Sequence, residues 1–305
     1  MLNIAVLGGG DSSEREVSLI SSKKVFENLD ESKYHKEYFD FPVDLDKFLS
    51  DYKKFDVVMP VFHGTFGEDG TVQGFLKTLG LKFTFSDVEA MSIALNKQLA
   101  KSLLEKLTDI KMPQGKIFDY LTLDIAQIKK SFNTPMVLKP VAGGSSLGTY
   151  IVKTDDELES AIKNIKQYKQ AVLVEEFIKG VEETVAILGN NDPQALPVIE
   201  IRPKTEFFDY IAKYDSKFCE EICPAPIDEA LAKELQRQAL LAHQTLGCRG
   251  LSRSDFIVTA DNQIYFLEIN TIPGMTDASL VPKAAAAAGY SYPKFLDKLI
   301  ELAFE

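Results

Sequence analysis

The sequence lacks the features that would place the protein in a membrane or on a nucleic acid. No apolar run approaches the ~18 residues needed to cross a bilayer. Positive charge is scarce, because 34 Lys and Arg face 45 Asp and Glu and the formal net charge is −11. A nucleic-acid surface needs clustered basic side chains that displace counterions from phosphates. We therefore expect no membrane and no nucleic-acid partner, and any anionic ligand must meet a local group of positive charges.

Export signals are also missing, and cysteine is rare. Residues 1–7 carry neither the basic flank nor the small-residue cleavage site of a signal peptide, and they have the pattern of a strand. Cys219, Cys223 and Cys248 match neither a zinc-site spacing nor the Cys-x-x-Cys redox motif. Reduced thiols in a cytoplasmic protein are the expected state.

The length of 305 residues is enough for two or three compact units with clefts between them. Up to about residue 90, short apolar runs alternate with helical patterns, as in the βα units of a parallel sheet. Strands are predicted at 4–7 and 57–62, and Ser13 with Glu16 has the form of a capping box that opens a helix. His63 follows the second strand, at the carboxyl edge where open α/β sheets place ligands.

From about residue 88 the pattern changes to antiparallel strands and longer helices. One predicted helix carries Lys97, and the next strands are predicted at 136–138, 150–153 and 171–174. A second antiparallel sheet is predicted from strands at 198–201, 256–258 and 264–269, with helices at 229–245 and after Ser279. The predicted fold class is α/β (α+β): an N-terminal parallel α/β domain at 1–88, followed by a pair of antiparallel-sheet domains at 89–178 and 179–305.

The most informative segment is a predicted hairpin near the C-terminal end. Asp-Asn at 261–262 suits a two-residue turn, because both residues tolerate positive φ. Centring the hairpin there pairs Asp255 with Glu268 and Arg253 with Asn270. Strand residues two apart share a face, so these four polar side chains converge on one side of the sheet.

This pairing predicts a metal site. Facing Cβ atoms lie roughly 4.5–5.5 Å apart, so Asp255 and Glu268 would repel each other unless a cation lay between them. Two carboxylates and the amide of Asn270 suit Mg²⁺, which takes few protein ligands and completes its octahedron with water and phosphate oxygens. The alternative is an exposed, solvated charged face. Ile257 and Phe266 are predicted on the same face as the floor of a cleft, which favours the metal. The opposite face is predicted to consist of Phe256, Val258, Tyr265, Leu267 and Ile269.

Residues 139–148 form a glycine-rich loop after a strand. Glycines let backbone N–H groups approach an anion, the hydroxyl groups of Ser145 and Ser146 add donors, and Lys139 adds positive charge. The loop is not a Walker A motif, and a flexible hairpin would look similar. Gly8–Gly10 is a weaker signal, because Ser13 replaces the last glycine of the dinucleotide fingerprint.

Two further segments have the chemistry of binding sites. Residues 63–74 begin with a strand-end imidazole and continue as a glycine-rich turn into a helix, although a lone histidine is more often structural. Residues 270–275 end the metal strand in a turn. Ser279 is a fair N-cap for an alanine-rich helix whose free N–H groups could bind a substrate carboxylate.

Taken together, these segments resemble the D-alanine–D-alanine ligases of the ATP-grasp superfamily over nearly the whole chain. The resemblance is carried by residues 63–74, and by residues 247–274 with Arg253, Asp255, Glu268 and Asn270 at the matching positions. It implies three domains, with ATP held between the antiparallel sheets of the central and C-terminal ATP-grasp domains. It also implies that two D-alanines are joined through a D-alanyl phosphate, with release of ADP and phosphate, for peptidoglycan precursor synthesis. A cytoplasmic homodimer that uses two Mg²⁺ ions, with Mn²⁺ able to substitute, belongs to the same expectation.

The resemblance also implies roles by motif position. The implied catalytic residues are Glu14, Ser145, Tyr214, Arg253 and Gly274. The implied substrate-binding residues are Glu14, His63, Arg253, Ser279 and Leu280. The implied ATP-binding residues are Lys97, Lys139, Ser145, Glu175, Glu176, Phe177, Ile178, Glu182, Lys213 and Phe266. The implied metal ligands are Asp255, Glu268 and Asn270.

The sequence departs from the family pattern at three places, and two rival functions are open. The segment from 201 to 224 is short for the loop that closes over the site in the family. Gly143 stands in a loop where many relatives carry an acidic residue, and Glu176 stands where lysine is common. The nearest rival is a ligase that makes D-alanyl-D-lactate, but Ala212–Tyr214 has the form associated with dipeptide synthesis and favours an amine acceptor. The other rival is a regulatory nucleotide-binding protein without catalysis, which would have lost residues such as Asp255 or Arg253; both are present.

Overall fold

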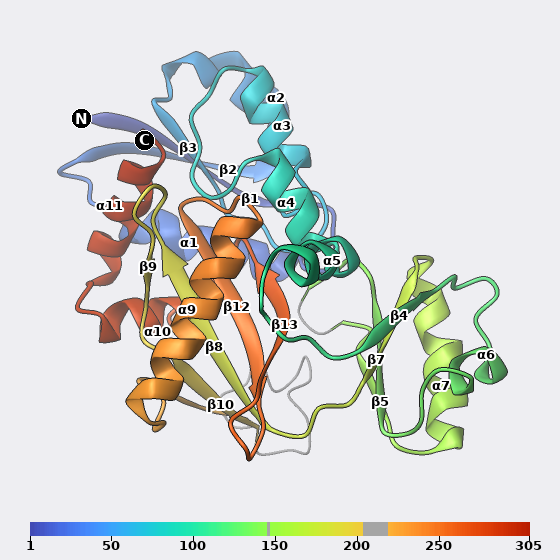
Figure 1. The fold of residues 1–305 in the computed structure, drawn as a ribbon. Helices are drawn as coiled ribbons and strands as arrows, with labels where there is room; N and C mark the ends of the chain where they lie inside the picture. The colour runs from blue at the N-terminus through green and yellow to red at the C-terminus, as the bar shows by residue number, and fades with distance from the viewer. Residues whose placement is uncertain (145–146, 204–218) are drawn as a thin grey trace.

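The structure is a computed structural model that describes residues 1–144, 147–203 and 219–305 (Figure 1). Its described strands form three sheets, one parallel and two antiparallel. The predicted fold class, with an N-terminal parallel sheet followed by two antiparallel sheets, is confirmed. Within the described ranges, no helix combines the length and apolar character needed to cross a membrane. The three cysteines are unpaired thiols, as expected.

The N-terminal sheet has the strand order β2-β1-β3, with all pairs parallel. Its central strand is apolar on both faces, and Ile4, Ala5, Val6 and Leu7 are fully buried, as expected where helices cover both sides. The elements of this part are β1 (Leu2–Gly9), α1 (Arg15–Asn28), β2 (Tyr34–Phe41), α2 (Leu45–Asp51), η1 (Tyr52–Lys54), β3 (Val57–Pro60) and α3 (Thr71–Thr78).

The predicted capping box of Ser13 and Glu16 is wrong. Helix α1 begins at Arg15, and its N-cap residue is Glu14 without a capping hydrogen bond from a side chain. Ser12 takes over instead: its Oγ accepts a hydrogen bond from the Glu14 backbone N–H at 3.1 Å and donates to the His63 carbonyl at 2.9 Å. This long-range link fixes the turn before the helix and buries Glu14 at the edge of the sheet.

The middle part contains the first antiparallel sheet, in the order β4-β7-β5-β6. Two helices precede it where one was expected, because the chain leaves helical geometry at Asn96, whose side chain accepts a hydrogen bond from the Leu99 N–H and starts the second helix. The elements are α4 (Val88–Leu95), α5 (Lys97–Leu107), β4 (Gly115–Phe118), α6 (Ile125–Lys129), β5 (Met136–Pro140), β6 (Tyr150–Val152), α7 (Asp155–Ile165), η2 (Lys166–Tyr168) and β7 (Val172–Glu176).

The last part contains the larger antiparallel sheet, in the order β11-β10-β8-β12-β13, with β9 on β8. Helix α9 packs on one face of it and spans the range predicted from the sequence. The elements are β8 (Val181–Leu188), β9 (Gln194–Ala195), β10 (Ile199–Pro203), β11 (Cys219–Ile222), α9 (Glu229–Thr245), β12 (Leu251–Val258), β13 (Ile264–Asn270), α10 (Leu280–Ala287) and α11 (Tyr292–Leu302).

The two ends of the chain share one core. Phe295 and Leu296 of α11 pack with Ile4 and Val6 of β1, so the C-terminal helices close over the N-terminal sheet. In Figure 1 the two termini accordingly lie close together, and α11 runs beside β1 and α1. This packing brings the turn after β13 against the carboxyl edge of the parallel sheet.

Candidate active site

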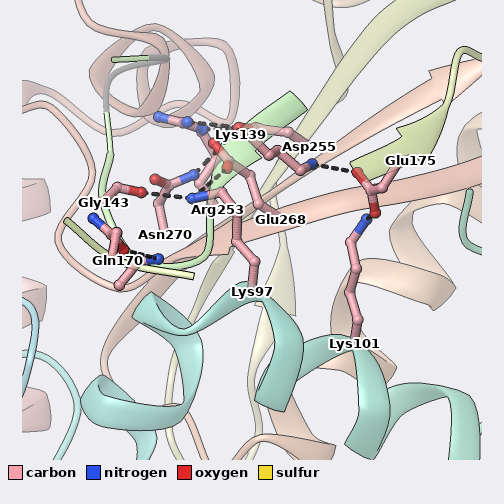
Figure 2. A network of polar contacts seen from close by, with 11 residues as sticks. Lys97, Lys101, Lys139, Gly143, Gln170, Glu175, Arg253, Asp255, Glu268 and Asn270 are labelled. Carbon is pink, nitrogen blue, oxygen red and sulfur yellow. Dashed lines mark hydrogen bonds and ion pairs between the residues drawn. The ribbon is translucent and has the colours of Figure 1, made fainter. Parts of the chain in front are cut away.

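The predicted hairpin forms and pairs the four polar residues as predicted, but its strands shift register nearer the turn. Arg253 pairs with Asn270 and Asp255 with Glu268 across β12 and β13. A basic side chain compensates the negative charge of each carboxylate. Arg253 donates from Nε and Nη2 to the two oxygens of Asp255, each at 2.8 Å, and Lys97 Nζ lies 3.3 Å from Glu268 Oε2 (Figure 2).

Asp255 is held from three sides. Besides the fork of Arg253, the Thr184 hydroxyl donates to Oδ1 at 2.6 Å, and the Asn270 amide donates to Oδ2 at 3.2 Å. Asp255 is almost fully buried, and the Arg253 side chain beside it is 13% exposed. Burial acts to lower the pKa of Arg253, but Asp255 and Glu268 outweigh it and hold this pKa above its ordinary value. Arg253 is therefore charged, and its guanidinium group is fixed against the Asp255 carboxylate.

The hairpin contains an irregularity that the sequence did not indicate. The register shifts between Asp255 and Phe256, so that Phe256 faces Phe266 and Leu267 is an extra residue on β13. Between the turn and the bulge, residues 264–266 of β13 therefore point to the opposite face of the sheet from the one that simple alternation predicts.

The prediction that Phe266 lies on the cleft face is wrong for this reason. Phe266 is fully buried in the core under α9, in an edge-to-face contact with Phe256. Leu267 takes its place in the cleft with Ile257, and Tyr265 also turns away from the core. Phe256, Val258 and Ile269 lie on the face opposite the cleft, as predicted, and are buried in the core there.

A cavity of about 370 Å³ lies between the two antiparallel sheets, within the size range of small-molecule sites. Its lining combines apolar side chains, among them Val137, Ile151 and Ile257, with charged ones. The lining includes most of the residues assigned to ATP: Lys97, Lys139, Glu175, Glu176, Phe177, Ile178 and Glu182, together with Asp255 and Glu268. Ser145 and Lys213, also assigned to ATP, lie outside the described residues, as does Tyr214.

A second cavity of about 300 Å³ lies beside the first. It brings together Arg253, Gly274, Ser279 and Leu280, which were assigned to substrate binding or catalysis. Glu182 and Asp255 line both cavities, so the two spaces meet at these carboxylates. Ser279 occupies the N-cap position of α10 as predicted, but its hydroxyl accepts a hydrogen bond from the Thr276 N–H at 3.0 Å and does not cap the helix.

His63 and Glu14 occupy a buried junction between the N-terminal sheet and the turn after β13. The His63 ring contacts the Ile272 carbonyl through Nδ1 at 3.1 Å and the Ser21 hydroxyl through Nε2 at 2.9 Å. Burial lowers the pKa of His63 to about 4, so the ring is neutral. The Glu14 carboxylate lies against the glycine backbone of the neighbouring loop, since a Cβ added at Gly64 would come within 2.7 Å of its Oε1.

Two buried charged residues near this site, Glu68 and Lys101, were not expected from the sequence. Glu68 accepts hydrogen bonds from the N–H groups of Gly64 at 2.7 Å and Ile272 at 3.3 Å, and burial, with a smaller contribution from Glu14, raises its pKa to about 8. Lys101 pairs with Glu175 behind the first cavity. Its position one helical turn after Lys97 was the available signal, because such residues share a helix face.

Together, these features define an enzyme of the ATP-grasp class: two antiparallel sheets enclose a cavity lined by lysines and acidic side chains. The comparisons agree. A family model described as "D-ala D-ala ligase C-terminus" matches residues 113–301, and one described as "D-ala D-ala ligase N-terminus" matches residues 40–86. The D-alanine–D-alanine ligase of Desulfotalea psychrophila is 43% identical, over 100% of this chain and 95% of its own length.

Solved structures give the same result. A crystal structure of D-alanine–D-alanine ligase from Bacillus anthracis has a TM-score of 0.87 and 36% identity, covering 100% of this chain and 98% of that one. A structure of the B. anthracis enzyme complexed with ATP has a TM-score of 0.86 and 33% identity, with the same coverage. The chain belongs to the D-alanine–D-alanine ligase family.

Proposed function

We propose that this chain uses ATP to join two D-alanines into D-alanyl-D-alanine, with release of ADP and phosphate, for peptidoglycan precursor synthesis. The observation that carries the proposal is the meeting of two cavities at Asp255 and Glu182. A nucleotide in the larger cavity and an amino acid in the smaller one would face each other across these carboxylates. Such an arrangement suits phosphoryl transfer from ATP to a carboxylate, where positioning and charge stabilisation supply the catalysis.

The nucleotide would lie between the sheets. Glu175 to Ile178 would contact the adenine, largely through backbone groups, and Glu182 the ribose. Lys97 is at the phosphate end, where its ammonium group also donates to the Gly143 carbonyl at 2.5 Å. Lys139 projects into the same cavity from β5. Lys213 is proposed as a third phosphate ligand and Ser145 as a further contact.

The residues where the two cavities meet fit Mg²⁺ or Mn²⁺. In the part of the chain that the structure describes, no three His, Cys, Asp or Glu side chains gather as a metal site by themselves. The donor set proposed here is two carboxylates, Asp255 and Glu268, with the amide oxygen of Asn270, all hard oxygen ligands. This small number of protein ligands suits Mg²⁺, which would be bound jointly with phosphate oxygens. When bound, two ions would neutralise the charge of the transferring phosphoryl group.

The chemistry divides into two transfers. The carboxylate of the first D-alanine attacks the γ-phosphorus of ATP and the bond to ADP breaks, which gives a D-alanyl phosphate. The amine of the second D-alanine then attacks the acyl carbon, loses a proton and expels phosphate. Arg253 and the Gly274 N–H would stabilise the negative charge that develops on the acyl oxygen.

The remaining residues would hold the two amino acids. Glu14 would bind the ammonium group of the first D-alanine, and His63 would support it from the junction. Ser279 and Leu280, at the start of α10, would bind the carboxylate of the second D-alanine through the free N–H groups of that helix end. Tyr214 is proposed to couple to Ser145 and Glu14 when the substrates are bound.

We propose further a cytoplasmic homodimer with domains at 1–88, 89–178 and 179–305. The family membership supports both the assembly and the location, and the three sheets support the division. These assignments can each be tested separately from the reaction, by the sedimentation mass of the purified chain and by limited proteolysis at the two domain boundaries.

A single assay tests the function. Phosphate release from ATP and product formation would be measured with D-alanine, L-alanine and D-lactate in parallel. Of the three compounds, we expect only D-alanine to give a dipeptide. We expect no ester when D-lactate is offered as the acceptor. Equal or better use of D-lactate would identify the rival depsipeptide ligase, and the absence of any phosphate release would leave a nucleotide-binding protein without catalysis.

A further inference from the structure

A buried ion network lies behind the nucleotide cavity. Glu175 is 2% exposed, and each of its carboxylate oxygens contacts a different ammonium group: Lys139 Nζ lies 2.6 Å from Oε2, and Lys101 Nζ pairs with Oε1. Figure 2 shows Lys101 rising from α5 to this carboxylate. Lys139 lines the nucleotide cavity, whereas Lys101 lies on the far side of Glu175, in a separate groove.

The strand register explains how three charged side chains meet here. Glu175 on β7 pairs with Val137 of β5, and Lys139 follows two residues later on the same face. The neighbour of Glu175 on the other side is Gly115 of β4, where an added Cβ would lie only 3.1 Å from the Glu175 Cγ. The missing side chain leaves space for Glu175 to be reached from outside the sheet.

Lys101 fills that role because of its place on α5. It follows Lys97 by one helical turn, so the two lysines share a face of the helix. Lys97 reaches the phosphate end of the cavity and contacts Glu268, while Lys101 reaches Glu175. One helix thus supplies positive charge at two points along the nucleotide.

The charge balance gives Lys101 a function. The described lining of the cavity contains two lysines, Lys97 and Lys139, and more acidic side chains than that: Glu175, Glu176, Glu182, Asp255 and Glu268. Lys139 with Glu175 alone would form a neutral pair and offer little attraction to a polyanionic nucleotide. With Lys101 added, two ammonium groups share one carboxylate, and the group carries a net positive charge.

The ionisation states agree with this balance. Burial lowers the pKa of Lys101 to about 8, and nearby Lys139 lowers it too, so the ammonium form still predominates at neutral pH. Burial acts to raise the pKa of Glu175, but Lys139 and Lys101 outweigh it and hold this pKa below its usual value.

We propose that Lys101 is a positioning residue for nucleotide binding: it neutralises Glu175 from behind, so that the ammonium group of Lys139 remains available to the nucleotide. The inference rests on the proposed function, because it assigns ATP to this cavity. Lys101 itself touches no ligand. It acts through the carboxylate that it shares with Lys139.

The test is Lys101→Met, which removes the charge and keeps most of the apolar stem. We expect the Kd for ADP, measured by calorimetry, and the KM for ATP to rise about tenfold, equivalent to about 1.4 kcal/mol. The KM for D-alanine and the kcat at saturating ATP should change little. Lys101→Arg should restore nucleotide affinity. Lys106→Met, an exposed lysine on the same helix, is the matched control and should bind ADP as the wild type does.

A double variant separates positioning from simple stability. Removing Lys101 leaves a buried carboxylate with one partner fewer, which can also destabilise the fold. Lys101→Met should therefore weaken ADP binding when Glu175 is present and have no further effect in a Glu175→Gln background, where that carboxylate is absent. A further loss of ADP affinity on adding Lys101→Met to Glu175→Gln would overturn the proposal, even if Lys101→Met alone does not fold. So would a lowered melting temperature in Lys101→Met with an unchanged KM for ATP. If the wild type binds ADP but makes no dipeptide, the proposed function fails while the ADP comparison still decides the role of Lys101.

Discussion

Two buried carboxylates line the nucleotide cavity, and they are held in different ways. Asp255 lies where the two cavities meet, and its main cation, Arg253, comes from the same strand. Glu175 borders the nucleotide cavity only from the side, and its two cations come from α5 and β5. Under the proposed function, the first carboxylate would lie where bonds change, and the second would set the electrostatic potential around the nucleotide. Equal burial therefore does not mean equal function.

The largest effect on activity is expected where the two cavities meet. Asp255→Asn should abolish turnover while the fold survives, because the amide keeps the shape and removes the negative charge proposed to bind Mg²⁺. Glu268→Gln should do the same. The measurements are phosphate release and the melting temperature. Glu229→Gln, which changes an exposed glutamate on α9, is the control and should retain activity. Near-normal turnover in Asp255→Asn with unchanged magnesium dependence would remove the distinction between the two carboxylates.

The next prediction tests the two sides of β13 against each other. Phe266→Ala should lower the free energy of unfolding by about 3–5 kcal/mol, as truncation of a fully buried phenylalanine does, and leave the KM for ATP nearly unchanged. Leu267→Ala should do the reverse, with a smaller loss of stability and a raised KM for ATP. Urea unfolding and initial-rate kinetics on both variants give the answer. If Phe266→Ala raises the KM and Leu267→Ala does not, the bulge assignment is wrong.

The third prediction tests whether Arg253 stabilises the transition state. Arg253→Lys keeps the charge but loses the planar fork that contacts both oxygens of Asp255. By the scale of a single oxyanion donor, kcat should fall roughly 10²–10³-fold, with ADP affinity little changed. Single-turnover kinetics and ADP calorimetry measure the two quantities. A variant with normal kcat and a much reduced melting temperature would show that Arg253 is structural.

The smallest effect concerns the pH dependence of stability at the buried junction. The pKa of His63 is about 4 in the folded protein against an ordinary value of 6.5. As the pH falls, His63 therefore binds a proton in the unfolded chain before it does so in the folded protein. Its contribution to the free energy of unfolding is complete above pH 6.5 and is lost between pH 6.5 and about 4. At 1.36 kcal/mol per pKa unit the loss reaches roughly 3 kcal/mol.

The His63 contribution is isolated by comparing the wild type with His63→Gln in urea unfolding at several pH values. The difference between the two should shrink as the pH falls from 6.5 to 4. Glu68 acts with the opposite sign, since its raised pKa of about 8 favours the folded state at low pH. The contribution of Glu68 to stability is present in both the wild type and the variant, so it cancels in the difference. A constant difference across the range would mean that His63 titrates normally.

The sequence by itself determined the features that depend on neighbouring residues. The pairing of Arg253 with Asn270 and of Asp255 with Glu268 follows from two adjoining strands joined by a short turn, although the bulge shifts the register of the residues nearer the turn. Helix α9 follows from its own periodicity, and the parallel sheet from alternating apolar runs. The family motifs supplied the remaining site residues, and the structure brings Arg253, Gly274, Ser279 and Leu280 around one cavity.

Only the tertiary structure decided the features that depend on distant residues. Lys101 and Glu175 are 74 positions apart, and His63 and Ile272 are 209 apart, so no local pattern pairs them. The bulge at Leu267 depends on how β13 packs under α9, and it exchanged the cleft and core faces that alternation predicts. The physical reason is the same in each case. Burial of a charge or a ring becomes favourable only when a partner from another element arrives to pair with it or to cover it.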